Sequence, residues 1–190
     1  MSVQARVIGD LVDLSRLGRG RLSLQLERVD LRIVVDSAAE AVAALAAARG
    51  IKIAIGADAA VPPVHGDIAR LQQVVSNLLG NAIKHSDEGA TVHVAIDATA
   101  DSARIVVRDE GDGIAPELLP HIFEPYRQGA RASSGLGLGL AIVRQLVELH
   151  GGRVEATSAG LGQGACFIVV VPAIPLTRTA ASASREDRYR

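Results

Sequence analysis

The chain has 190 residues, 48 % of them apolar, which is enough for one domain with a substantial core. Aromatic residues make up only 2 %, so Ala, Val, Leu and Ile must fill that core, and the net charge of -1 argues against a nucleic-acid partner. No apolar run reaches the length of a membrane span, no N-terminal signal pattern is present, and the single cysteine, Cys166, cannot form an internal disulfide. We therefore expect a protein from a reducing compartment that makes no membrane contact of its own.

Hydrophobic periodicity and turn residues predict helices that alternate with strands. The expected elements are, in chain order, the end of a helix over 2–17, a strand over 21–30, a helix from Leu31 to Arg49 capped by Asp30, a strand over 51–56, an irregular connection over 61–66, a helix that begins at the N-cap Asp67, strands at 91–97 and 103–109, a short helix near 116–122, a helix from Leu138 to His150, and strands over 153–158 and 165–171. This pattern predicts an α/β two-layer sandwich.

The helix that follows Asp67 carries two carboxamides and a cation along one edge. At about 100° per residue, seven apolar residues form one continuous face, and Asn77, Asn81, Lys84 and His85 lie together on its flank. Asparagine is a poor helix former, so two of them four residues apart suggest a polar ligand, although they could also bind buried backbone groups.

Two glycine-bearing segments follow along the chain. DEGDGI, residues 109–114, comes directly after a strand, so Asp109 lies at a sheet edge beside backbone that can approach a ligand closely. GLGLGLAIV, residues 135–143, leads into a helix whose first amides and dipole favour phosphate. Each segment alone is more typical of a loop, and neither the dinucleotide fingerprint nor a phosphate-loop motif is present. The combination of three polar segments is what predicts a nucleotide site.

These three segments in this order, together with HIFEPYRQG at 121–129, resemble the N, G1, F and G2 boxes of the ATP-binding catalytic domain of sensor histidine kinases. That family belongs to the GHKL superfamily with the Bergerat fold, which includes type II topoisomerase, heat-shock chaperone and mismatch-repair ATPases. The resemblance covers residues 20–172 and implies a mixed, mainly antiparallel sheet of about five strands packed on about three helices, with an ATP lid. Residues 1–19 resemble the end of the second helix of a dimerisation and phosphoacceptor domain, and residues 173–190 are typical of a linker or disordered tail.

The resemblance also implies roles for individual residues. Asn81 would coordinate Mg²⁺ and Lys84 would contact phosphate, while Asp109 would recognise adenine. His85 stands where the family often has Tyr or Phe beside the nucleotide, and Phe123 can equally serve to anchor the lid to the core. The residues expected to hold ATP are Asn77, Asn81, Lys84, His85, Asp109, Gly111, Gly113, Ile114, Tyr126, Arg127, Gly135, Gly137, Leu138, Gly139 and Leu140. Tyr126 and Arg127 would begin the lid, and the glycines from 135 to 139 would form its far hinge.

Asn77 and Lys84 are the expected catalytic residues. The hydrolysing members of the superfamily carry a glutamate at the position of Asn77, one turn before Asn81, and an amide cannot take a proton from water. We therefore expect slow ATP hydrolysis and transfer of the γ-phosphoryl group to a histidine, with positioning supplied by Mg²⁺, Lys84 and the glycine backbone.

The acceptor histidine is expected to come from another domain. None of the five histidines, at 65, 85, 93, 121 and 150, has the surroundings of the family's acceptor, and His150 sits at a helix end where its cation would favour the dipole. The implied partners are a histidine-bearing dimerisation domain and a response regulator or receiver domain, and this chain alone should not autophosphorylate. The resemblance implies a cytoplasmic location, within a chain that can form part of a larger membrane-associated receptor.

Two other functions remain open on the sequence. An ATP-responsive module could grip a regulatory partner through its lid without phosphorylating it. A serine kinase of the anti-sigma-factor type would share the fold, but it ordinarily lacks the preceding helix remnant.

Overall fold

The computed structural model describes residues 22–58, 61–99, 101–127 and 136–174 of the chain. Its elements are, in chain order, β1 (Glu27–Val29), α2 (Leu31–Ala48), β2 (Lys52–Ala57), β3 (Val64–Gly66), α3 (Ile68–His85), β4 (Thr91–Ala98), β5 (Ser102–Asp109), the 3-10 helix η1 (Leu119–His121), α4 (Gly139–Leu149), β6 (Arg153–Thr157) and β7 (Ala165–Pro172). The helix end expected over 2–17, most of the tail expected over 173–190 and Gly135 lie outside the described residues.

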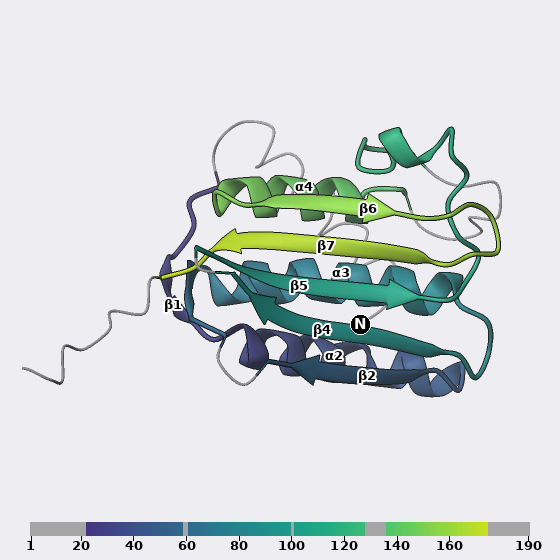
Figure 1. Ribbon diagram of the computed structural model, residues 1–190, viewed down its shortest axis with the longest axis horizontal. Coiled ribbons are helices and arrows are strands. Elements are labelled where there is room, and N and C mark those ends of the chain that lie inside the picture. Colours follow the sequence, from purple (N-terminus) through teal and green to yellow (C-terminus); the bar gives the residue numbers. More distant parts are fainter. Residues whose placement is uncertain (1–21, 59–60, 100, 128–135, 175–190) are drawn as a thin grey trace, which may run out of the picture.

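Within these ranges, three α-helices cover one face of a five-stranded sheet (Figure 1). The strand order is β2-β4-β5-β7-β6, in which β2 runs parallel to β4 and the other neighbours are antiparallel. Alternate residues of β5 explain this layering, because Ala103, Ile105 and Val107 are buried towards the helices while Arg104 and Arg108 face the other way. The two-layer α/β fold with a mixed, mainly antiparallel sheet is confirmed.

The central helix α3 packs into the core through the apolar face that its sequence predicts. All seven of its predicted apolar residues are at most 1 % exposed, namely Leu71, Val74, Val75, Leu78, Leu79, Ala82 and Ile83. Each buried Val, Leu or Ile side chain contributes about 1.5–3 kcal/mol. The helix begins where expected, because the Asp67 carboxylate accepts a hydrogen bond from the Arg70 amide at 3.2 Å.

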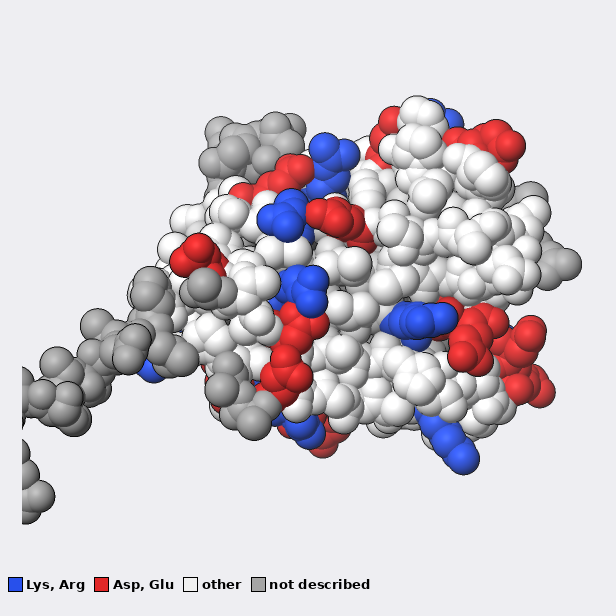
Figure 2. Space-filling model, in the orientation of Figure 1, with Lys and Arg blue, Asp and Glu red and all other residues white. Residues whose placement is uncertain are grey.

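The face of the sheet that points away from the helices is open. Figure 2 shows a band of charged side chains across this face and a second charged group at the right, with uncharged surface between them. Arg104 and Asp97, which are paired on neighbouring strands, form an ion pair with Nη2 and Oδ2 2.9 Å apart. A shallow hollow of about 410 Å³ lies on this face over Ala54, Gly56 and Ala95, where two methyl groups and a glycine leave space. It is remote from the polar edge of α3, which lies on the helical side.

Three local predictions are wrong in detail. The strand expected over 21–30 is reduced to Glu27–Val29, and the irregular connection over 61–66 contains a strand, β3, which pairs antiparallel with β1. The prolines at 62 and 63 hid this strand, since it begins only after them. The short helix expected near 116–122 is a single 3-10 turn.

His150 has a structural role and links two helices. It is 8 % exposed, its Nδ1 lies 2.7 Å from the Leu146 carbonyl oxygen, and its Nε2 accepts from the Asp67 amide at 3.0 Å. The imidazole therefore ties the C-terminal end of α4 to the N-terminal end of α3.

The backbone pairing continues just past Pro172. Ala173 forms a bridge with Val64, and the Ile174 amide donates to the Pro63 carbonyl at 2.8 Å. None of the helices in the described ranges combines the length and apolar character needed to cross a bilayer.

Candidate nucleotide site

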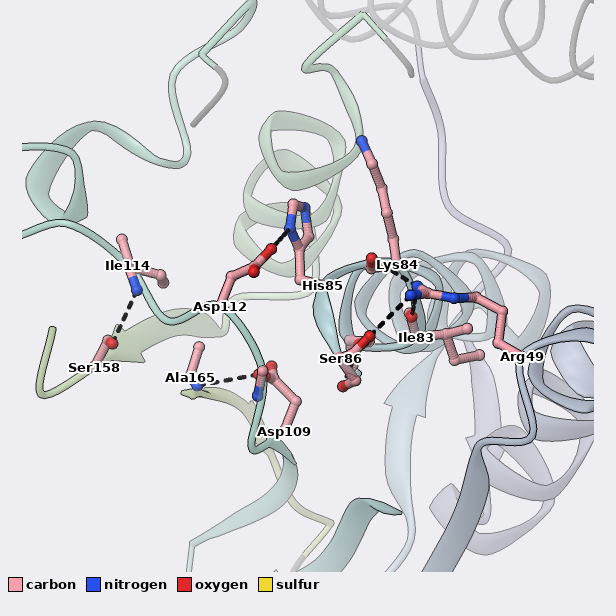
Figure 3. A network of polar contacts seen from close by, with 12 residues as sticks. Arg49, Ile83, Lys84, His85, Ser86, Asp109, Asp112, Ile114, Ser158 and Ala165 are labelled. Atoms are coloured by element: carbon pink, nitrogen blue, oxygen red, sulfur yellow. Dashed lines mark hydrogen bonds and ion pairs between the residues drawn. The ribbon is translucent and has the colours of Figure 1, made fainter. Parts of the chain in front are cut away.

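The polar edge of α3 ends against the turn that follows β5 (Figure 3). The Asp112 amide donates to the His85 carbonyl at 2.8 Å, and His85 Nδ1 lies 3.2 Å from Asp112 Oδ2. Gly111 packs so closely on this helix end that an added Cβ would lie 2.0 Å from the His85 carbonyl oxygen. Two of the three predicted segments are therefore in direct contact.

Asp109 is a buried carboxylate at the C-terminal end of β5. It is 5 % exposed, and its Oδ1 accepts from the amides of Gly111 at 3.0 Å and Ala165 at 3.3 Å. Burial raises the pKa of this carboxyl, and the two amides and His85 partly oppose the rise. Both hydrogen bonds described for the carboxylate end on Oδ1, so Oδ2 can accept from a ligand.

The loop between β6 and β7 forms a wall that the sequence interpretation missed. The Ser158 hydroxyl accepts from the Ile114 amide at 3.0 Å and donates to the Gly164 carbonyl at 2.7 Å. Gly113 has φ +66, and an added Cβ there would lie 2.0 Å from the Gly160 carbonyl oxygen. The turn at 109–114 is thus clamped between the end of α3 and residues 158–164. The glycines of this loop, in the sequence SAGLGQGA, were the available signal.

The start of α4 lies against the middle of the same polar edge. Asn77 Nδ2 is 3.4 Å from the Gly139 carbonyl oxygen, and Asn81 and Lys84 follow on α3, half-buried. The N-cap of α4 is Leu138, which is buried and makes no side-chain capping bond to the first amides. A helix start of this kind leaves N–H groups for an anion. The half-buried Leu140 lies in its first turn.

The two ends of the predicted lid meet at the start of α4. The Tyr126 amide donates to the Gly137 carbonyl at 3.0 Å, and Gly137 has φ +68, where an added Cβ would lie 2.7 Å from the Arg127 carbonyl oxygen. The Tyr126 side chain is 67 % exposed, and Arg127 pairs with Glu124 at 2.9 Å. Hydrogen bonds from His121 and Arg127 lower the pKa of Glu124.

Phe123 anchors this region to the core. Its ring meets Phe167 edge-on, with centroids 6.5 Å apart and an angle of 86° between the planes. The structural reading of Phe123 therefore explains its position. Gly135, expected in the far hinge, is outside the described residues.

Comparison with known proteins gives consistent matches. The family model of histidine kinase-, DNA gyrase B-, and HSP90-like ATPases matches residues 66–175. The alginate biosynthesis sensor protein KinB of Pseudomonas aeruginosa is 34 % identical over 172 residues, which cover 90 % of this chain and 29 % of that protein. Sensor histidine kinase MtrB of Mycobacterium leprae is 35 % identical over 172 residues, or 88 % of this chain and 30 % of that protein. The chain thus spans less than a third of the length of these curated relatives.

Solved structures give the same picture. Full-length ShkA in complex with AMPPNP superposes with a TM-score of 0.78 at 34 % identity, over 88 % of this chain and 35 % of that one. The mycobacterial sensor histidine kinase MprB gives a TM-score of 0.71 at 33 % identity, over 79 % of this chain and 100 % of that chain.

Proposed function

We propose that this chain, which belongs to the histidine kinase-, DNA gyrase B-, and HSP90-like ATPase family, is the ATP-binding catalytic domain of a sensor histidine kinase. The observation that carries the proposal is the convergence of three segments that are far apart in sequence: the polar edge of α3, the turn at 109–114 and the start of α4. On this proposal residues 1–19 belong to a dimerisation and phosphoacceptor domain, and residues 173–190 to a linker or tail.

The base would bind beside Asp109. Oδ2 can accept from the exocyclic amine of adenine, while Oδ1 is held by two backbone amides. Gly111 and Gly113 let the backbone lie close to the base, and Ile114, packed against the core, would contact its face.

The phosphates would bind between α3 and α4. The uncapped first turn of α4, at Gly139 and Leu140, offers amides to a phosphate group, and Lys84 supplies a positive charge. Asn81 offers an amide oxygen that suits Mg²⁺, an ion that keeps most of its ligands as water and phosphate oxygens. The described residues hold no group of three or more His, Cys, Asp or Glu side chains that could bind a metal. Mg²⁺ would neutralise charge that develops on the phosphates.

The reaction would be phosphoryl transfer to an imidazole nitrogen on a separate helical domain. A P–N bond forms to the γ-phosphorus as the bond to the β–γ bridging oxygen breaks, and ADP leaves. Asn77 offers no base to activate water, which favours the imidazole over hydrolysis. Lys84 would stabilise the charge on the transferring group, and a response regulator or receiver domain would take the phosphoryl group next.

Labelled ATP tests this proposal. The chain is mixed with γ-labelled ATP, Mg²⁺ and a separately supplied helical domain that carries the acceptor histidine of a related sensor kinase. Acid-labile label on that domain is expected. Acid-stable label on a serine-bearing partner would indicate the anti-sigma-factor type of kinase, and ATP binding without transfer would indicate a binding module.

A pair of amide variants tests the metal assignment. Asn81→Ala should weaken ATP binding in Mg²⁺ but not in EDTA, as measured by calorimetry. Gln72→Ala is the matched control, since this carboxamide lies nine residues earlier on the same helix and therefore on about the opposite face. Equal losses in both variants, or a loss for Asn81→Ala that persists in EDTA, would contradict the assignment.

A further inference from the structure

One arginine from α2 closes the C-terminal end of α3 (Figure 3). Arg49 is the C-cap residue of α2, and its Nη1 donates to the carbonyls of Ile83 and Lys84, the second at 2.7 Å. Its Nη2 donates to the Ser86 carbonyl at 3.0 Å. The last carbonyls of a helix have no partner inside the helix, so this single guanidinium satisfies three acceptors at the helix end.

The backbone of Arg49 holds the same region. Its own carbonyl accepts from the Gly89 amide at 3.2 Å, so both its side chain and its main chain bind the segment from 83 to 89. The guanidinium also places a positive charge at the negative end of the α3 dipole, where Lys84 and His85 already lie in the last turn.

The carbonyls at this helix end are divided between two partners. Those of Ile83, Lys84 and Ser86 bind Arg49, whereas that of His85 accepts from the Asp112 amide in the turn beside Asp109. The Lys84 side chain extends away from the guanidinium (Figure 3). Arg49 therefore fixes the backbone from which both the phosphate-side cation and the base-side turn are positioned.

We infer that Arg49 is a positioning residue for nucleotide binding, acting through the last turn of α3 on Lys84, His85 and the turn at 109–114. This inference rests on the proposed function, because it assigns Arg49 to the same nucleotide site. Without the guanidinium, the three carbonyls would have to find water, which favours fraying of the turn that carries Lys84.

ADP affinity of arginine variants provides the first test. Arg49→Met should bind ADP about tenfold more weakly, the effect of about one lost charge-assisted hydrogen bond. Arg49→Lys should be weakened several-fold, because an ammonium group cannot match the forked geometry of the guanidinium. Arg32→Met is the control, since Arg32 lies on the same helix, is exposed, and pairs locally with Asp36 at 2.8 Å. Wild-type affinity in folded Arg49→Met overturns the inference, and if that variant does not fold, wild-type affinity in Arg49→Lys does so.

A double-mutant cycle separates positioning from general stability. If Arg49 acts through the turn that carries Lys84, the losses of ADP affinity in Arg49→Met and Lys84→Met should combine to less than their sum. Fully additive losses would mean that Arg49 does not act through Lys84, and the inference would then fail.

Hydrogen exchange gives a readout that does not need nucleotide. The Asp112 amide, which donates to the His85 carbonyl, should exchange faster in Arg49→Lys than in the wild type, while amides in β7 keep their protection. Unchanged protection of Asp112 overturns the inference. If the wild-type chain itself does not bind ADP, the proposed function fails. The exchange result then still shows whether Arg49 holds the contact between Asp112 and His85.

Discussion

Replacing Asp109 by asparagine should separate nucleotide recognition from folding. The asparagine Oδ1 can keep both bonds from the amides of Gly111 and Ala165, but Nδ2 replaces Oδ2 and presents a donor to the adenine amine. Loss of a charge-assisted hydrogen bond is worth about 1.5–3 kcal/mol. ADP should therefore bind about 10- to 150-fold more weakly, and the preference for ADP over GDP should narrow.

The same substitution should make the folded protein more stable relative to the wild type as the pH rises. Burial raises the pKa of Asp109 in the folded state, so the folded protein holds this proton more tightly than the unfolded chain does. The resulting stabilisation is complete below the unfolded pKa, about 3.9, and is lost as the pH rises through the raised folded value. Asparagine does not titrate, so the stability of Asp109→Asn relative to the wild type should increase with pH over this range and then level off.

Two measurements check this reasoning. Calorimetry gives the affinities for ADP and GDP, and urea unfolding at a series of pH values gives the free energies of unfolding. Glu110→Gln is the control, because this neighbouring carboxylate is exposed and its loss changes the net charge equally. The reasoning is refuted if Asp109→Asn binds ADP like the wild type, or if its relative stability falls as the pH rises.

Four further substitutions, one of them a matched control, test other parts of the structure. Gly111→Ala would place a methyl group 2.0 Å from the His85 carbonyl oxygen and should lower the free energy of unfolding by about 3 kcal/mol. Gly80→Ala on α3 is the control, because the new methyl group has open space there, and it should raise the free energy of unfolding by about 0.5–1 kcal/mol. Urea unfolding that shifts both variants in the same direction would contradict this. His150→Leu removes the acceptor of the Asp67 amide and should cost about 1–3 kcal/mol in the same assay while the folded protein keeps its ADP affinity, so a large loss of affinity would speak against a purely structural histidine. Asn77→Glu should raise ATP hydrolysis at least about tenfold by supplying a base for water, and an unchanged rate of phosphate release would show that the amide is not what restrains hydrolysis.

Periodicity was sufficient to predict the layered fold. The apolar face of α3 and the alternation in β5 are local patterns, and both persist in the folded core. The pairing of β1 with β3 was not predictable in the same way, because each strand has only three residues and the partners are more than thirty residues apart. Such short strands form only because the surrounding layers bring them together.

Candidate site residues could be proposed from the sequence where a polar side chain occupies an unusual place. Asn77 and Asn81 are poor helix formers that stand inside a continuous helix. Asp109 is a carboxylate at the end of a strand. For the clamp around the turn at 109–114, the glycines of the loop at 158–164 were the signal, and no polar side chain in an unusual place marked it. Ser158 binds the Ile114 amide from forty-four residues away, and its neighbours contribute backbone carbonyls that any residue would possess.

Arg49 shows why a charged residue at a helix end can be misread from sequence. A basic side chain in that position is typical of one that caps its own helix, which needs no tertiary information. Here the acceptors belong to another helix, thirty-four to thirty-seven residues further along the chain. The contact exists because α2 ends beside the C-terminal end of α3, whereas the start of α4 lies against the middle of α3. The role of Arg49 is therefore to be sought at the C-terminal end of α3, which its side chain contacts, and not in α2, which it follows in the chain.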